Sequence, residues 1–343
     1  MHVKYKALAF VGAITIVTSA ISGWSSYTSN AGIIEVARQK ELRGTATLIQ
    51  NDMLEQMNKA AARASIVVTM PSIQKAFREG DRDGLVERLL PVFLLQRDKY
   101  GVREGQFHTA PAVSFLRIYD AKAGWGEDLS SFREMVLATN RKQLPQKGVE
   151  IGRRGLSIRG IDVVKDAQGP IGSFEVGMAF TPVLENVKKN AGFDAGVFVD
   201  AKSFGEIATS LPKPDAEHLI GAYQNVEATN WKAVRPMVNG DLLNDAKDVV
   251  TRVQNVGGVD YGLVAVPLLD FKGSRIGAIV AVKSFEDYQT MQGGALVRAI
   301  AFGVLQALVM IGAMLVLINV LFIHPMAVAA AAASAAAAVK KEP

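Results

Sequence analysis

The sequence predicts an α+β protein in which two modules, each with an antiparallel sheet, follow one another on a long N-terminal helix flanked by two transmembrane helices. Three observations lead to this fold class. Apolar stretches lie near both ends of the chain. Helical spacing of apolar residues follows the first stretch. Strand-like alternation then recurs in two similar strand–turn–strand segments, Asp166 to Phe180 and Asp270 to Phe285.

The composition excludes several function classes. The 343 residues suffice for two domains. The formal charge is +5, but the basic residues are dispersed and form no dense run with aromatics, so we expect no nucleic-acid partner. With no cysteine, disulfides and thiolate catalysis are excluded, and the four histidines lack metal-ligand spacing. We find no catalytic triad or phosphate loop, so we expect no enzyme activity, catalytic residue, metal or cofactor.

The first apolar stretch covers residues 7–24 and contains only Ser and Thr as polar side chains. Lys4 and Lys6 precede it and Trp24 closes it, a pattern that fits either a cleaved signal peptide or a transmembrane helix. We expect a retained helix preceded by a cytoplasmic N-terminus, residues 1–6.

The second apolar stretch, residues 299–323, is uncharged and long enough to span a bilayer. Lys340 and Lys341 follow it, so the positive-inside rule puts both termini in the cytoplasm. We therefore expect a two-pass protein of the bacterial inner membrane, in contact with lipid, whose main part lies in the periplasm. Residues 324–343 would form an alanine-rich cytoplasmic tail.

A stalk helix is predicted over residues 25–70, because apolar and small residues recur at helical spacing from Ile33 to Val68 and no proline intervenes before Pro71. Two interpretations stay open: an amphipathic helix on a domain surface, or a stalk that also packs against its mate in a homodimer.

The first module is predicted over residues 71–192. We expect helices at 71–78, at 85–100 (bent or divided at Pro91), at 128–140 with Asp128 or Ser130 as N-cap, and from Pro182 to about Asn190, with strands at 113–119, 148–152, 156–164 and 171–180.

The second module is predicted over residues 193–290. Strands are expected at 195–200, 249–254, 259–269 and 276–285, with a loop-rich stretch between residues 202 and 247. Its last hairpin repeats that of the first module: an Asp, a Gly three residues on, an Ile-Gly pair and a Phe nine residues after the Ile. The alternative is a chance resemblance between two hairpins.

Charged residues distinguish the first module. Arg117 and Arg159 lie within predicted strands, where an unpaired guanidinium is costly to bury. One interpretation is an internal salt-bridge network with nearby glutamates. The other is a pocket in which one or two arginines bind a carboxylate or another anion between aromatic walls. The residues expected at this ligand site are Phe107, His108, Phe115, Arg117, Tyr119, Arg133, Glu150, Arg159 and Glu175.

The stretch from Gln106 to Glu175 carries a resemblance to a known family. Its motifs are Gln106-Phe107-His108, Pro111, Ser114 to Arg117, Asp128 to Arg133, Asn140, Gly148, Glu150, Gly152, Gly155-Leu156, Ile158 to Gly160, and Ile171 to Ser173 with Glu175. These motifs and the two-module architecture resemble the double Cache sensory domains of bacterial chemoreceptors and sensor kinases. One subgroup carries a His and a Pro where this chain has Tyr119 and Ala121.

The resemblance implies a PAS-like antiparallel sheet of five or six strands in each module, with a pocket on one face. It also implies that the first module is distal to the membrane and carries the ligand, as in a methyl-accepting chemotaxis protein. We therefore expect a membrane-anchored sensor of a small ligand. The alternative is a structural or accessory subunit that uses its modules for protein contacts. No signalling region follows residue 323, so the output is expected in a separate partner or in a longer form of the receptor.

Overall fold

A computed structural model describes residues 2–339 of the chain, which divides into two compact units. One unit combines Met1–Arg38 with Glu286–Pro343, and the other is Gln39–Phe285. Lys340 and Lys341, used above for the membrane orientation, lie outside the described residues.

The first unit is helical. It contains the start of α1 (His2–Val68), then α9 (Glu286–Ile318), the π-helical η3 (Asn319–Ile323) and α10 (His324–Val339). Two helical stretches, Ala9–Val68 and Glu286–Ser334, are long and apolar enough to cross a membrane by length and composition. The first covers residues 9–24 of the predicted span 7–24, and the second contains the predicted span 299–323. The helices approach closely at glycines: a Cβ on Gly23 would lie 3.1 Å from the Ala299 carbonyl oxygen, and one on Gly303 would lie 3.1 Å from that of Ser19.

Helix α1 continues unbroken for 67 residues, so the first predicted span and the predicted stalk are parts of one element. It ends at Val68, as predicted, because Pro71 opens the next helix and the residue before a proline avoids helical geometry. In the second unit, α1 buries a stripe at helical spacing that includes Leu42, Ile49, Ala60 and Ala64.

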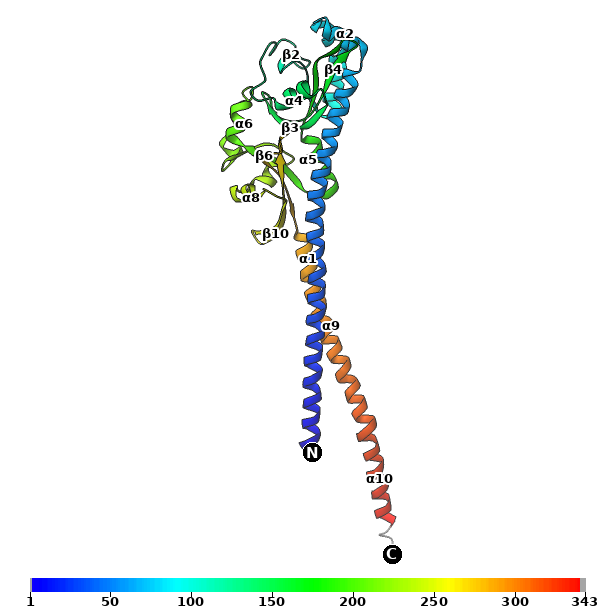
Figure 1. The fold of residues 1–343 in the computed structure, drawn as a ribbon. Coiled ribbons are helices and arrows are strands. Elements are labelled where there is room, and N and C mark those ends of the chain that lie inside the picture. Colours follow the sequence, from blue (N-terminus) through cyan, green and yellow to red (C-terminus); the bar gives the residue numbers. More distant parts are fainter. Residues whose placement is uncertain (1, 340–343) are drawn as a thin grey trace. The chain divides into compact units, whose positions relative to one another are not determined.

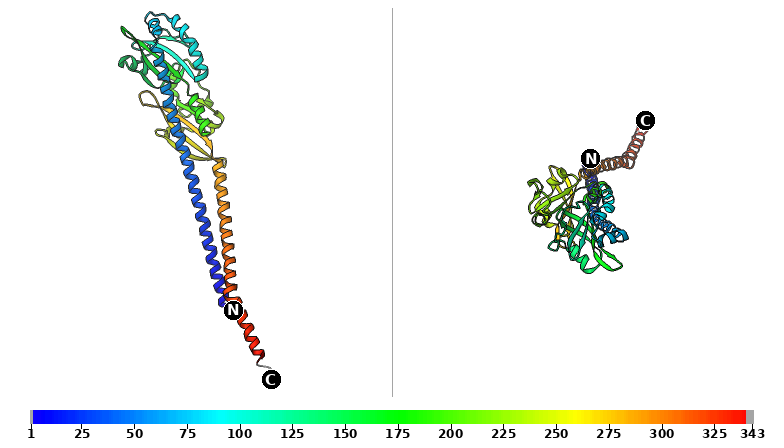
Figure 2. Two further views of the ribbon diagram at one scale, coloured as in Figure 1. Left: turned by 90° about the vertical axis from the view of Figure 1, so that its right-hand side faces the viewer. Right: turned by 90° about the horizontal axis from the view of Figure 1, so that it is seen from above.

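The second unit carries two antiparallel sheets, one after the other along α1, with the first sheet in green and the second in yellow to orange (Figure 1, and the left view of Figure 2). The first sheet has the order β2-β1-β5-β4-β3 and the second the order β7-β8-β6-β11-β10-β9. The five- and six-stranded antiparallel sheets implied by the family resemblance are thus confirmed.

The elements of the first module are α2 (Pro71–Arg78), α3 (Arg82–Tyr100), β1 (Val102–Thr109), β2 (Val113–Arg117), α4 (Glu134–Lys142), β3 (Gln146–Gly152), β4 (Gly155–Asp166), β5 (Gly169–Met178) and α5 (Thr181–Ala191). Those of the second are β6 (Asp194–Asp200), α6 (Ala201–Ile207), the 3-10 helix η1 (Ala216–His218), β7 (Leu219–Ile220), β8 (Tyr223–Ala228), α7 (Trp231–Val234), the 3-10 helix η2 (Arg235–Met237), α8 (Gly240–Asp245), β9 (Val250–Val256), β10 (Val259–Leu269) and β11 (Arg275–Ser284).

The repeated hairpins are confirmed as β4–β5 and β10–β11. In both, the glycine of the Ile-Gly pair lies against the backbone of a neighbouring strand. A Cβ on Gly172 would lie 2.2 Å from the carbonyl oxygen of His108 on β1. A Cβ on Gly277 would lie 1.9 Å from that of Phe198 on β6. Each glycine therefore permits the same close approach of a neighbouring strand.

The structure differs from the sequence predictions in three elements and excludes one of the two alternatives for a fourth. Strand β1 was not predicted, because Gly105 and its charged and polar residues give it no apolar alternation. The stretch 202–247 is not mainly loop, since it contributes β7 and β8 to the sheet. Pro91 lies inside a single helix, α3, and does not divide it.

Helix α4 begins at Glu134, six residues later than predicted, with Arg133 as its N-cap. The Asp128 side chain instead accepts from the Ser130 backbone N–H in a local turn.

Candidate functional site

The candidate site is the polar face of the first sheet, where consecutive strands place charged side chains side by side. Gln106 on β1 is the register partner of Glu175 on β5, and Glu175 is also the partner of Ile161 on β4. Because side chains alternate along a strand, Arg159 lies on the same face as Ile161 and Glu104 on the same face as Gln106. All five of the charged side chains that meet on this face are buried: Glu104, Arg133, Glu150, Arg159 and Glu175.

Glu175 is the central carboxylate of this charge network. One of its oxygens accepts from Arg133 Nη2, and the other accepts from Arg159 Nη1 at 2.7 Å. Burial alone would raise the pKa of Glu175, but the charges of Arg133 and Arg159 outweigh burial and lower that pKa to about 2. The glutamate is therefore ionised although none of its side chain is exposed.

Two further glutamates complete the network. Arg133 donates from Nε to Glu150 at 2.7 Å, and Glu150 also accepts from the Met135 backbone N–H at 2.9 Å. Arg159 donates from Nη1 to Glu104 at 2.8 Å, and Glu104 accepts from Ser157 Oγ at 2.8 Å. The internal salt-bridge network, one of the two interpretations of the arginines, is thus present in the structure.

The network holds three carboxylates and two guanidiniums, which leaves one carboxylate in surplus. It also leaves buried polar atoms unsatisfied: in the described residues, Arg159 Nη2 and His108 Nε2 have no hydrogen-bond partner. Gly152 makes room for the first of these, since a Cβ there would lie 2.6 Å from Arg159 Nη2. Buried unsatisfied atoms on a charged surface are typical of a ligand or water site.

The second module has an apolar surface in the corresponding place. The repeat aligns Glu175 with Val280, and Val280 is buried in an apolar core with Phe198 and Leu263. The fold therefore does not require charge at this position, and of the two modules only the first carries a charged residue there.

Four of the nine predicted site residues, Arg133, Glu150, Arg159 and Glu175, meet in the network. Glu104 was missed because it lies on the unpredicted strand β1. Its spacing of two residues from Gln106 was the available signal.

Arg117 lies at the edge of the site. It donates from Nη2 to Glu127 at 2.5 Å, and Arg153 shares that carboxylate at 2.9 Å. Its Nε is buried without a partner in the described part of the chain.

Two of the three predicted aromatic walls, Phe107 and Phe115, pack against α2. The ring centroid of Phe107 lies 5.0 Å from that of Phe77 on α2, and the ring centroid of Phe115 lies 4.9 Å from it. Tyr119 lies 6.3 Å from Phe93 of α3 and under the guanidinium of Arg154, and burial raises its pKa.

His108 is fully buried on the polar face, with Nδ1 3.5 Å from Ser173 Oγ. Burial disfavours its imidazolium and lowers its pKa to about 3, so the ring is neutral.

We expect the stability of the first module to fall as the pH drops from about 6.5 to 4.5, since the unfolded chain binds a proton at His108 that the folded chain refuses. The free energy of unfolding should lose up to about 1.4 kcal/mol per pH unit. Below pH 4.5, protonation of unfolded Glu175 adds to the loss. Denaturation of His108→Gln between pH 7 and about 5.5, where Glu175 is almost fully ionised in both the folded and the unfolded state, should give a flatter profile. His218→Gln, at a partly exposed ring, should keep the native slope.

A cleft of about 460 Å³ between the two modules opens beside the network. Glu150 belongs to both the network and the cleft lining, which also includes Ser131, Glu134, Phe271 and Lys272. Lys272 is paired with Glu134 at 2.9 Å, so the remaining charges of the lining are acidic. Among the described residues, no cluster of three metal-binding side chains occurs.

A family model and several solved structures are similar to this chain. The family described as the double sensory domain of two-component sensor kinase matches residues 37–289. A search of curated proteins finds no match.

Three solved structures are similar in fold. The periplasmic domain of Vibrio cholerae LuxQ is 12% identical, with 71% of this chain and 99% of that chain covered and a TM-score of 0.45. The ligand-binding domain of the Campylobacter jejuni chemoreceptor Tlp3 in complex with L-valine is 10% identical, with coverages of 78% and 98% and a TM-score of 0.44. The V. cholerae histidine kinase DctB sensor domain is 9% identical, with coverages of 74% and 97% and a TM-score of 0.42.

The family match spans most of the chain and both sheets. On these grounds the chain belongs to the double Cache family of sensory domains.

Proposed function

We propose that the chain is a membrane-anchored sensor whose first module binds a small polar ligand at the charged face of its sheet. The observation that carries this proposal is the buried charge network with its unsatisfied Arg159 Nη2 and His108 Nε2. A network kept only for stability has no need of unpaired atoms, because each costs about 1–3 kcal/mol. Membership of a sensory family supports a binding role over an enzymatic one.

The charge of the ligand follows from the surplus carboxylate. Arg133 and Arg159 are already bonded to glutamates, so a ligand carboxylate has to displace one of them. A ligand with an ammonium group instead neutralises the surplus. We therefore propose a ligand that carries a cationic group and also a hydrogen-bond acceptor for Arg159 Nη2, reaching the network through the cleft beside Glu150. A purely anionic ligand is the second choice.

Transmission of the bound state is proposed to run through α1 and β11. Lys283 on β11 pairs with Glu41 of α1 at 2.6 Å and donates to the Ala191 carbonyl oxygen at 3.2 Å. Asn186 on α5 donates to Asp52 of α1 at 2.6 Å. Ligand binding that favours one arrangement of the modules would change these contacts and shift the population of α1 and α9 positions.

The proposed setting is the bacterial inner membrane, with both modules in the periplasm and the first one distal to the membrane. Support comes from two helical stretches with the length and composition of membrane spans. A homodimer, contact with membrane lipid and a separate signalling partner belong to the same proposal.

A thermal-shift screen of the full chain in lipid nanodiscs tests the ligand. The panel consists of amino acids, amines, dicarboxylates and neutral sugars. We expect stabilisation by a compound with an ammonium group, since a ligand at a hundred times its Kd contributes about 2.7 kcal/mol. Glu104→Gln should weaken this stabilisation, whereas Asp245→Asn, at an exposed ion pair, should not. The sensor proposal is overturned if no compound in the panel stabilises the chain.

The internal pairing of Arg133 and Arg159 also supports the second candidate, a structural or accessory membrane subunit. Purification from native membranes separates the two functions. A large partner in fixed stoichiometry, together with no response to small molecules, favours the subunit.

A further inference from the structure

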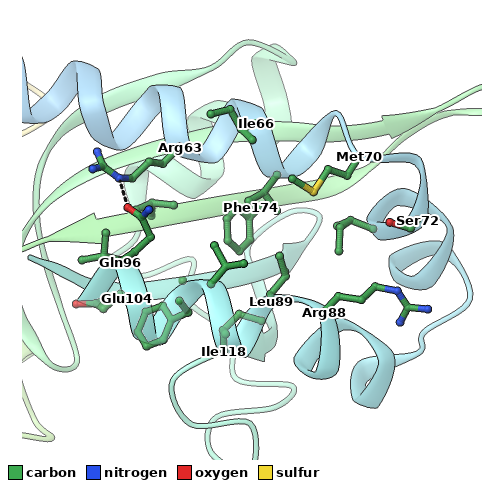
Figure 3. A pocket seen from close by; sticks show the side chains of 17 residues that line it. Arg63, Ile66, Met70, Ser72, Arg88, Leu89, Gln96, Glu104, Ile118 and Phe174 are labelled. Carbon is green, nitrogen blue, oxygen red and sulfur yellow. Dashed lines mark hydrogen bonds between the residues drawn. The ribbon is translucent and has the colours of Figure 1, made fainter. Parts of the chain in front are cut away.

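A groove lies on the opposite face of the first sheet from the charge network. Phe174 and Val176 of β5 line it, and they flank Glu175, so they point away from the network. The other walls are the end of α1 and helix α3 (Figure 3). The groove encloses about 370 Å³, which lies within the range of about 300–1,000 Å³ typical of small-molecule sites.

The middle of the groove is apolar. The lining includes Ile66 of α1, Met70 directly before α2, Leu89 and Val92 of α3, and Phe174. Ile66 is 59% exposed and Val92 is 53% exposed, so apolar surface faces water along the groove. Covering this surface is favourable by about 25 cal/mol per Å², so an apolar occupant is expected to gain affinity there.

Polar groups lie at the two ends of the groove, and each end carries an arginine, Arg63 or Arg88. Figure 3 shows Arg63 with Gln96 at one end and Arg88 with Ser72 at the other. In the described part of the chain, the one acidic residue of the lining is Glu104, whose carboxylate is already bonded to Ser157 and Arg159. Among the described residues, the groove thus presents two guanidinium groups and no carboxylate that is free to pair with them.

Arg63 lacks a carboxylate partner. Its Nε donates to Gln96 Oε1 at 2.9 Å, its Nη1 lies 3.9 Å from the Met178 sulfur, and its guanidinium lies over the Tyr100 ring at 5.7 Å. Within residues 2–339, Arg63 forms no ion pair shorter than 4.0 Å. Burial lowers the pKa of this guanidinium. Arg88 is held mainly by the Gly84 carbonyl oxygen, at 2.5 Å, with Asp81 at 4.0 Å.

We propose that this groove binds an amphiphilic monocarboxylate of medium chain length. The carboxylate pairs with Arg63, and the alkyl chain lies between α1 and α3 over Phe174. This site is distinct from the polar face assigned to the sensed ligand, so it gives the first module a second ligand of a different class. The alternative occupant, a second copy of the chain, does not account for a partly buried cation at one end of the groove.

Photolabelling of the full chain in nanodiscs tests the proposal. The probe is decanoate with a diazirine at its tail, and labelled peptides are located by mass spectrometry. We expect labels in residues 63–73 and 88–96, competed by decanoate and by dodecanoate but much less by decanol. Arg63→Gln should weaken competition by decanoate on the order of tenfold, the loss expected for one hydrogen bond to a charged group. Arg63→Lys should restore part of it.

Two tryptophan variants of α3 provide the matched control. Val92→Trp fills the groove and should abolish the label, whereas Leu95→Trp, at an equally exposed position that does not line the groove, should leave it unchanged. If Val92→Trp does not fold, Val92→Glu introduces a repelling carboxylate at the same exposed site. Equal competition by decanol, or labels that persist in the position 92 variants, would overturn the proposal. So would a change of oligomeric state in these variants without specific labelling, which would assign the groove to a second copy.

The photolabelling results for the Arg63 and Val92 variants are independent of the thermal-shift screen, because neither residue belongs to the charge network.

Discussion

Replacement of Arg159 with methionine is expected to destabilise the first module by about 3–5 kcal/mol, the cost of breaking a buried ion pair from one side. Methionine keeps much of the volume but removes the charge that Glu104 and Glu175 share. Three buried carboxylates then face Arg133 alone. The surplus of negative charge rises from one to two.

Hydrogen exchange of the β4 and β5 amides in the full chain measures this loss locally. Combining Arg159→Met with Glu104→Gln returns the surplus to one carboxylate, so the double variant should be more stable than the single one. Arg252→Met is the control, because its pair with Asp245 is largely exposed and should contribute less than about 1 kcal/mol. A loss below about 1 kcal/mol for Arg159→Met would mean that the network is hydrated in solution.

Replacement of Gly160 with alanine is expected to cost about 3 kcal/mol, at the upper end of the usual range for overpacking. A Cβ on Gly160 would lie 2.1 Å from the Ala61 nitrogen and 2.3 Å from the Ala60 carbonyl carbon. These are backbone atoms of α1, so no side chain can move aside. The sheet and the helix must separate.

Limited proteolysis and hydrogen exchange between residues 39 and 68 should reveal that separation as weaker protection of α1. Gly205→Ala is the matched control. It lies inside α6, where an added Cβ would have nothing within 4 Å, and alanine there should stabilise the helix by up to about 1 kcal/mol. Native protection of α1 in Gly160→Ala would show that β4 and α1 are not in contact in solution.

Much of the fold was predictable because its signals are local. Pro71 marks the end of α1 and the start of α2 at the residues observed. The hairpin turns at Asp166 and Asp270 fix two pairs of neighbouring strands, one in each copy of the repeat. Strand β1 was not predictable in this way, since Arg103, Glu104 and Gly105 interrupt any apolar alternation and its burial comes from packing on both faces of the sheet.

The residue types of the site were predictable from the sequence, but whether its arginines are paired within the protein was not. Arginines on buried strands require anions, and Glu150 and Glu175 were the available partners in the sequence. Whether these partners belong to the protein or to a ligand depends on side-chain distances, which periodicity does not give. The groove at Arg63 carried no sequence signal at all, because α1, α3 and β5 meet only in the fold.

The alignment of Glu175 with Val280 has a consequence for how the two modules diverged. A change of valine to glutamate in an apolar core is prohibitive alone, as is the introduction of a single arginine. Each charge of the network is tolerable only when its partners are present. The mutational path between the two interiors is therefore strongly epistatic. Removing one charge from the complete network leaves a buried charge unpaired, just as introducing one charge into the apolar core does. Single substitutions therefore do not easily convert one interior into the other.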